Sequence, residues 1–260
     1  MMTVDVDGES KFGEFPWSVL ILSKYPEDLS FQYQCGGALI HPRAVLTAAH
    51  CVEDEKKLFL VRAGEWDRSF EMEFFPHQDR DVKTVFLHPH YFNETLYNDI
   101  AVVLLESPFD LTNHIDVVCL PNGEVSVPSD AQCYLTGWGK RNQTKNIVDI
   151  LKKIELFMVD ATTCESRIRT RQSEHFSLHS SFVCALGAYG GSACTGDGGS
   201  ALVCPIPGET GRYQQIGVAS WGIGCGFSPY PGVYANVPLL KHWVDEIFRD
   251  NNLDPESYKI

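Results

Sequence analysis

Two residues of this 260-residue sequence have the types and surroundings needed for acid–base chemistry. His50 stands in the segment LTAAHC, after an apolar run, and Asp99 stands directly before the strongly apolar run 100–105. Taken alone, such a histidine is more often structural, and such an aspartate is more often a cap or turn residue. A buried carboxylate beside an imidazole, however, fixes its tautomer and stabilises its protonated form. The pair therefore predicts a general base for an alcohol nucleophile.

The nucleophile that such a base serves should lie on a glycine-rich turn, where backbone N–H groups converge to hold an oxyanion. The segment 194–202, CTGDGGSAL, fits this description. Its glycines surround Asp197, and its one serine is Ser200. We therefore place the third part of the candidate site in this segment.

The elements that must position these residues are short strands. β-rich runs recur between glycine and proline turn signals at 18–22, 37–40, 58–63, 100–105, 133–137, 152–157, 201–204, 215–220 and 232–237. Such runs are typical of an all-β barrel or sandwich. The exception is the C-terminus, where one helical face after Pro238 carries Leu239, Leu240, Trp243 and Ile247. That helix is expected to seal the fold.

The amino-acid composition and the charge exclude several classes of protein. Hydrophobic residues make up 44% and charged residues 21%, so the chain can bury a substantial core. The balance of 21 basic against 34 acidic residues gives a net charge of -13, which argues against a nucleic-acid partner or a polybasic membrane surface. No apolar run approaches the length needed to cross a bilayer. We predict neither a nucleic-acid nor a membrane partner.

The nine cysteines are spread along the whole chain, with no CxxC pair and no Cys/His cluster at zinc spacing. This distribution favours disulfides in an oxidising compartment over a metal site. Two glycosylation sequons, at Asn93 and Asn142, point weakly the same way. The sequence thus predicts a secreted protein.

Seven ordered motifs resemble those of trypsin-like serine proteases of the chymotrypsin fold, across nearly the full length of the chain. They are FPW at 15–17, CGG at 35–37, TAAHC at 47–51, DIA at 99–101, TGWG at 136–139, SWG at 220–222 and PGVY at 231–234. The resemblance implies one all-β domain, 1–260, of two six-stranded antiparallel β-barrels with a C-terminal α-helix. The barrels are expected at about 15–120 and 130–237, and the helix at 239–250.

The chain departs from this family at the nucleophile. The family turn reads Gly-Asp-Ser-Gly-Gly, whereas the aligned residues here begin Gly196, Asp197, Gly198. The resemblance therefore leaves His50 and Asp99 as triad remnants, and Gly196 to Gly198 as an oxyanion-turn remnant without a serine. Ser200 lies two residues further on, ~6–7 Å away in extended chain, too far to replace the nucleophile. We predict a pseudo-protease, not an enzyme.

A second departure concerns activation. In family enzymes, an ammonium freed by cleavage pairs with the aspartate that matches Asp197. Counting back from Phe15 puts that terminus near 4–7, where the sequence has neither a preceding basic residue nor a glycine pair. We therefore expect Asp197 to lack its usual ammonium partner.

The specificity pocket of the family can also be matched. Its base corresponds to Ser192, and its walls correspond to Gly222 and Gly232. This describes an open slot without a basal acid to hold Arg or Lys. In a protein that no longer cuts, the slot is expected to be an unused relic rather than a peptide-binding pocket.

The resemblance also implies a disulfide pattern, which spacing alone could not choose among 105 pairings of eight cysteines. The implied pairs are Cys35–Cys51, Cys133–Cys204, Cys164–Cys184 and Cys194–Cys225. Cys119 is left over. In clip-domain relatives the matching cysteine bonds an N-terminal light chain, and that clip region is not expected in this sequence.

The stretch 62–82 resembles that of insect clip-domain serine protease homologues, which act as cofactors in prophenoloxidase activation, the melanisation branch of innate immunity. Glu65, Asp67 and Glu73 match a loop that holds calcium in some members, and oxygen ligands suit that hard cation. Three acids on a hairpin fit solvent-facing surface charge equally well.

These resemblances imply a secreted adaptor or cofactor protein of a proteolytic cascade, located in a haemolymph-like extracellular fluid. They imply no bound cofactor for catalysis. The implied partners are prophenoloxidase, its activating proteases and a light chain bound through Cys119. Two alternatives stay open. One is an active trypsin-like endopeptidase that uses Ser200 or another nucleophile, and the other is a secreted binding domain with no cascade role.

Overall fold

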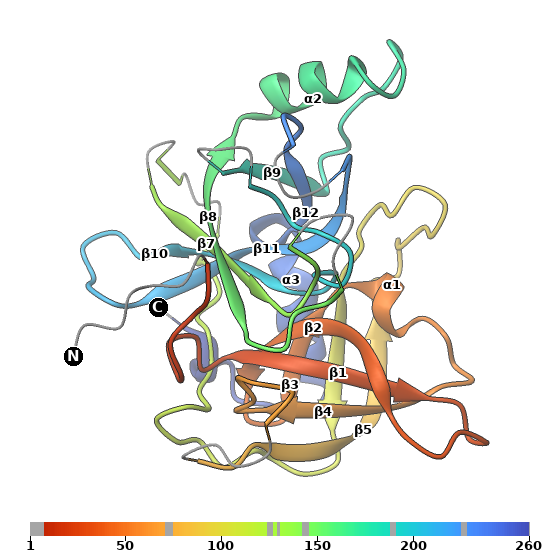
Figure 1. Ribbon diagram of the computed structural model, residues 1–260, viewed down its shortest axis with the longest axis vertical. Coiled ribbons are helices and arrows are strands. Elements are labelled where there is room, and N and C mark those ends of the chain that lie inside the picture. The colour runs from red at the N-terminus through yellow and green to blue at the C-terminus, as the bar shows by residue number, and fades with distance from the viewer. Residues whose placement is uncertain are drawn as a thin grey trace.

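The computed structural model describes residues 8–70, 75–123, 127–128, 131–141, 146–187, 191–224 and 228–259. Their strands form two closed antiparallel barrels of six strands each. Figure 1 shows strands β1 to β5 of one barrel below strands β7 to β12 of the other. The predicted all-β fold of two six-stranded barrels with a C-terminal helix is confirmed.

The first barrel has the strand order β1-β2-β3-β6-β5-β4. Its strands are β1 (Ser18–Lys24), β2 (Gln32–His41), β3 (Ala44–Thr47), β4 (Leu58–Ala63), β5 (Gln78–Leu87) and β6 (Ala101–Leu105). β3 and β6 are buried at every position and pair with one another, which explains their unbroken apolar runs. A Cβ atom on Gly37 of β2 would lie 2.8 Å from Val45 Cγ1, so glycine is needed for this close packing.

The second barrel has the strand order β10-β11-β12-β9-β8-β7. Its strands are β7 (Cys133–Gly137), β8 (Lys152–Val159), β9 (Phe182–Leu186), β10 (Ala201–Pro205), β11 (Tyr213–Gly222) and β12 (Gly232–Asn236). The largest core cluster contains residues of both barrels and of the C-terminal helix, so the two barrels share apolar packing.

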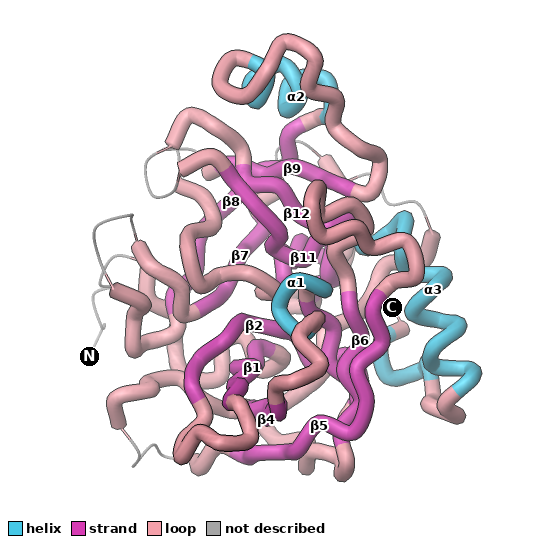
Figure 2. Tube along the Cα trace, turned by 90° about the vertical axis from the view of Figure 1, so that its right-hand side faces the viewer, coloured by secondary structure: helices cyan, strands magenta, loops and turns pink. Residues whose placement is uncertain are grey.

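Four short helical segments complete the described chain. They are α1 (Ala49–Val52), α2 (Ala161–Arg169), α3 (Val237–Asp250) and the 3-10 helix η1 (Pro255–Tyr258). Figure 2 shows α1 in the middle of the molecule, between the strands of the two barrels. None of the helices within the described residues is long and apolar enough to span a membrane.

Helix α3 packs against β11 but begins two residues earlier than predicted. The side chain of Asn236 caps it by accepting a hydrogen bond from Leu239 N. Its buried positions are Val237, Leu240, Trp243, Val244 and Phe248. The prediction that Leu239 lies on the buried face is wrong, because the i, i+3, i+4 spacing runs from Val237 and leaves Leu239 46% exposed.

Candidate functional site

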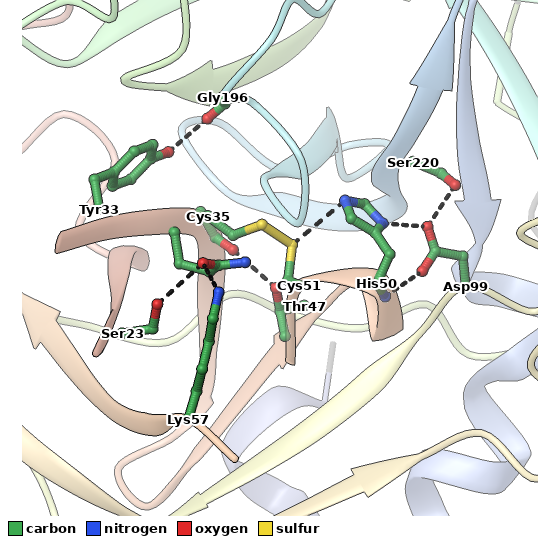
Figure 3. Close-up of a disulfide and its surroundings, with 12 residues drawn as sticks. Ser23, Tyr33, Cys35, Thr47, His50, Cys51, Lys57, Asp99, Gly196 and Ser220 are labelled. Atoms are coloured by element: carbon green, nitrogen blue, oxygen red, sulfur yellow. Dashed lines mark hydrogen bonds and ion pairs between the residues drawn. A yellow bond between two sulfur atoms is a disulfide. The ribbon is translucent and has the colours of Figure 1, made fainter. Parts of the chain in front are cut away.

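The histidine and the aspartate come from the ends of two paired strands. His50 lies on α1, directly after β3, and Asp99 lies just before β6. Because Thr47 of β3 pairs with Ala101 of β6, the residues beyond this pair are brought together. His50 Nδ1 lies 2.7 Å from Asp99 Oδ2, and Figure 3 shows the two side chains facing one another.

Asp99 is fully buried and contacts both the ring and the backbone of His50. Its Oδ1 accepts a hydrogen bond from His50 N at 2.9 Å, and its Oδ2 accepts one from Ser220 Oγ at 2.6 Å. Burial lowers the pKa of His50, but the hydrogen bond and the charge of Asp99 outweigh it, so the pKa is raised above its ordinary value. The geometry is that of a general base whose protonated form is stabilised.

Gly198 faces the imidazole from the glycine-rich turn. A Cβ atom built on Gly198 would lie 2.8 Å from His50 Nε2. Glycine provides no side chain at this point. His50 Nε2 lies 3.6 Å from the sulfur of Cys51, which forms a disulfide with Cys35.

Ser200 is placed elsewhere. Its hydroxyl packs against β2 and β7, since a Cβ atom on Gly36 or Gly137 would meet Ser200 Oγ at 2.2 or 2.9 Å. Ser200 is buried, and no hydrogen bond joins it to His50 within the described chain. The structure therefore brings together His50, Asp99 and Gly198, but not Ser200.

The turn is anchored by a buried ion pair. Lys152 Nζ, at the start of β8, lies 2.6 and 2.7 Å from the two carboxylate oxygens of Asp197. Lys152 Nζ also donates to Gly139 O at 2.8 Å. Asp197 in turn accepts hydrogen bonds from Gly139 N and Cys194 N. Burial lowers the pKa of Lys152, against the attraction of Asp197, and these acceptors hold the ammonium in the interior.

The expectation that Asp197 lacks its usual ammonium partner, a freed chain terminus, stays a prediction, but Asp197 is not left without an ammonium. The terminus expected near 4–7 lies outside the described residues, and the side chain of Lys152 supplies an ammonium to Asp197 instead. The sequence held one signal, a lysine at the first position of the run 152–157 that was expected to be a strand. Only the three-dimensional contact identifies its partner.

The turn also leaves two backbone donors in a cleft. Neither Gly196 N nor Gly198 N donates a hydrogen bond within the described residues. The carbonyl oxygen of Gly196 accepts a hydrogen bond from the Tyr33 hydroxyl at 2.6 Å, on the side of the turn away from His50 (Figure 3). Both glycines line a cleft of about 450 Å³, together with His50 and residues 219–222.

Of the three pocket remnants, one lines this cleft. Gly222 lines the cleft, and a Cβ atom on Gly232 would meet the Tyr234 hydroxyl at 2.9 Å. Ser192 is buried, and its hydroxyl has no hydrogen-bond partner among the described residues. The residue matched to the base of the family's specificity pocket is therefore a serine and not an acid.

The predicted calcium ligands have protein partners. The buried carboxylate of Glu65 lies 3.3 Å from both Arg62 Nη1 and His77 Nδ1. Asp67 Oδ1 accepts hydrogen bonds from the backbone N and hydroxyl of Ser69. Glu73 lies outside the described residues, so the calcium site stays a prediction.

In the described part of the chain, the one cluster of potential metal ligands is Cys35, His50 and Cys51. Because the two sulfurs are joined in a disulfide, this cluster offers no thiolate to a metal.

The cysteines pair as the resemblance implies, as far as they are described. The observed disulfides are Cys35–Cys51, Cys133–Cys204 and Cys164–Cys184. Cys194 is disulfide-bonded, and Cys225 lies outside the described residues. Cys119 is a free cysteine, and its sulfur accepts a hydrogen bond from Arg212 Nη2 at 3.3 Å. Of the two sequons, Asn93 is exposed and Asn142 lies outside the described residues.

Comparison with known proteins agrees with this geometry. The chain is 46% identical to Phenoloxidase-activating factor 2 of Galleria mellonella, over 98% of the chain and 87% of that protein. It is 38% identical to Inactive CLIP domain-containing serine protease A8 of Anopheles gambiae, over 91% of the chain but 65% of that protein. It is 35% identical to Protein masquerade of Drosophila melanogaster, over 95% of the chain and 23% of that protein.

The model of the Trypsin family matches residues 6–244, which include both barrels and every residue of the cleft. With its two-barrel fold and its paired His50 and Asp99, the chain belongs to the trypsin family.

Proposed function

We propose that this chain is a non-catalytic serine protease homologue that acts as a binding cofactor in an extracellular proteolytic cascade of innate immunity. The observation that carries the proposal is Gly198, whose missing side chain would stand 2.8 Å from His50 Nε2. Acyl transfer requires an alcohol or thiol within hydrogen-bond reach of the base. With none in that place, His50 and Asp99 have nothing to activate.

Ser200 does not fill the gap, because its hydroxyl packs against the backbone of Gly36 and Gly137. Bringing it to His50 would require the turn to move away from Lys152 and Tyr33, which hold Asp197 and the Gly196 carbonyl. An active enzyme that uses Ser200 is therefore disfavoured by the packing.

The relatives support the cascade role. Similar proteins carry the names of a phenoloxidase-activating factor and of inactive CLIP-domain proteases. By this likeness the partners are prophenoloxidase and its activating proteases, in a haemolymph-like fluid. We further propose that Cys119 bonds a light chain, that Asn93 and Asn142 carry glycans, and that Glu65, Asp67 and Glu73 bind calcium.

The test combines hydrolysis with binding. Purified protein is incubated with trypsin-, chymotrypsin- and elastase-type peptides, and its binding to prophenoloxidase and to the activating protease is measured by surface plasmon resonance. Phenoloxidase activity is then followed with and without the chain. We expect no turnover, binding to at least one protein, and a gain in phenoloxidase activity.

Two results would contradict the proposal. Hydrolysis that disappears in Ser200→Ala would make the chain an active endopeptidase. Binding to neither protein would leave a secreted domain with no role in this cascade.

A further inference from the structure

Lys152 and Asp197 satisfy one another almost completely in the interior. All N–H groups of the Lys152 ammonium have acceptors, because it lies 2.6 and 2.7 Å from the Asp197 oxygens and 2.8 Å from Gly139 O. A carboxylate accepts about four hydrogen bonds, and Gly139 N and Cys194 N donate those that Lys152 does not. Neither charged side chain has hydrogen-bonding capacity left for a further group.

Both charges are shielded from water. Lys152 is 2% exposed and Asp197 is 0% exposed. Burial lowers the pKa of Lys152 and the attraction of Asp197 opposes this effect, so each charge depends on the other. A second ammonium that approached Asp197 would have to displace Lys152 and leave its charge unpaired in the interior, which is strongly unfavourable. The carboxylate is therefore already occupied.

The described start of the chain runs beside the strand that carries Lys152. Glu9 pairs with Lys152 in an antiparallel bridge, and Lys153 N donates to Gly8 O at 2.8 Å. These contacts use main-chain groups, whereas Lys152 reaches Asp197 through its side chain. The pairing of the chain start with β8 therefore does not involve the carboxylate of Asp197.

The backbone around Asp197 is fixed on both sides of the residue. Asp197 N donates to Cys194 O at 2.9 Å, and Ser200 N donates to Asp197 O at 3.1 Å. Gly36 N of β2 donates to Gly198 O at 2.9 Å. Together with the ion pair, these bonds set the path of the glycine turn, and none of them requires a terminal ammonium.

We propose that Lys152 sets the shape of the glycine turn by itself, so that the turn is the same whether or not the chain is cleaved upstream of Gly8. Cleavage there does not switch the turn, and any control by cleavage has to act through another part of the molecule. The inference concerns the shape of the turn and not its partner, so it does not rest on the proposed function.

The first test changes only the start of the chain. Chains that begin at each of the positions 4–7, where the family places its freed terminus, are compared with the chain that begins at Met1. Hydrogen exchange is measured by NMR at Gly139 N and Cys194 N, which donate to Asp197. We expect the rates to agree within about twofold in every chain, since Lys152 already orders the turn. Slower exchange than this in any shortened chain would show that a freed terminus orders the turn and would overturn the proposal.

Variants then identify the ammonium that orders the turn. Rates are expressed relative to the buried amides of β4, so that a general loss of stability is not mistaken for a local one. Lys152→Met should speed exchange at Gly139 N and Cys194 N by about tenfold or more, because their shared acceptor loses its ammonium. The control is Lys153→Met, which removes an ammonium that pairs with Glu14 and should leave both rates unchanged.

A second variant covers the case in which Lys152→Met does not fold. The double variant Lys152→Met/Asp197→Asn removes both charges, so neither is left unpaired in the interior. Exchange at Gly139 N and Cys194 N should again be faster than in the wild type, since neither amide keeps a charged acceptor. Unchanged rates in the folded variants would contradict the role given to Lys152, and the first test needs neither variant.

Discussion

The ammonium of Lys152 holds the turn on which family enzymes carry their nucleophile. It contacts both carboxylate oxygens of Asp197 and the carbonyl of Gly139, all in the interior. A charge in such surroundings is tolerated only while it is paired, because removing an ion from water costs several kcal/mol. Lys152 therefore acts as a structural part of the site, although it never reaches the cleft.

Replacing Lys152 by methionine should leave Asp197 as an unpaired buried charge. We expect Lys152→Met to lower the free energy of unfolding by about 3–5 kcal/mol, measured by urea denaturation. The matched control is Lys153→Met, next in the chain, whose ammonium pairs with Glu14 nearer the surface. Its loss should stay near or below about 1 kcal/mol. Equal losses of unfolding free energy in the two variants would show that the buried ion pair contributes no more stability than the pair nearer the surface.

The pKa of His50 gives a second residue-level prediction. Burial lowers this pKa and Asp99 raises it to a net increase, so Asp99→Asn should bring it below the wild-type value. The measurement is an NMR titration of the imidazole. Glu53→Gln is the control, since Glu53 raises the pKa through space as the smallest contribution, and its effect should be smaller. An unchanged pKa in Asp99→Asn would contradict the assigned cause.

At the scale of elements, the sequence predicted the contacts whose residues stand next to recognisable strands. The apolar runs of β3 and β6 mark two neighbouring strands, and the residues just beyond them, His50 and Asp99, meet as expected. The contacts of Lys152 with Asp197 and of Tyr33 with Gly196, in contrast, join the glycine turn to residues that no family motif marks. No periodicity or motif spacing records such pairs, because they depend on how the two barrels close.

The segment between β4 and β5 carries the calcium prediction. If an ion binds Glu65 and Asp67, it stabilises the fold by about 2.7 kcal/mol at a free concentration a hundred times its dissociation constant. We expect wild-type protein to melt several degrees higher in millimolar calcium than in chelator, and Glu65→Ala to show no such difference. Equal wild-type melting temperatures would leave Arg62 and His77 as the partners of Glu65.

At the scale of the whole molecule, the glycine turn ties the two barrels together. Gly36 N of β2 donates to Gly198 O at 2.9 Å, and Tyr33 of β2 donates to Gly196 O. The main apolar core also includes residues of both barrels. The cleft therefore lies beside contacts that join the two barrels. Its shape is largely preformed, which favours binding because less conformational freedom is lost.

We expect Cys119 to connect this domain to a larger assembly. It lies on the segment between the barrels, and its backbone oxygen accepts a hydrogen bond from Gln215 N of β11. Its sulfur is partly accessible and free, whereas the described cysteines other than Cys119 are disulfide-bonded.

When the domain is expressed together with an upstream clip region, disulfide mapping by mass spectrometry should find Cys119 joined to a cysteine outside residues 1–260. Cys119→Ser should release that region under non-reducing conditions after cleavage between the two parts, while the pairs Cys35–Cys51, Cys133–Cys204 and Cys164–Cys184 stay intact. The domain itself should keep its melting temperature in this variant, because the hydrogen bonds of the Cys119 sulfur in the described chain are to Arg212 Nη2 and the carbonyl of Lys259, near the surface. Finding Cys119 paired with one of the eight other cysteines would refute the assignment, since every described cysteine other than Cys119 is already disulfide-bonded.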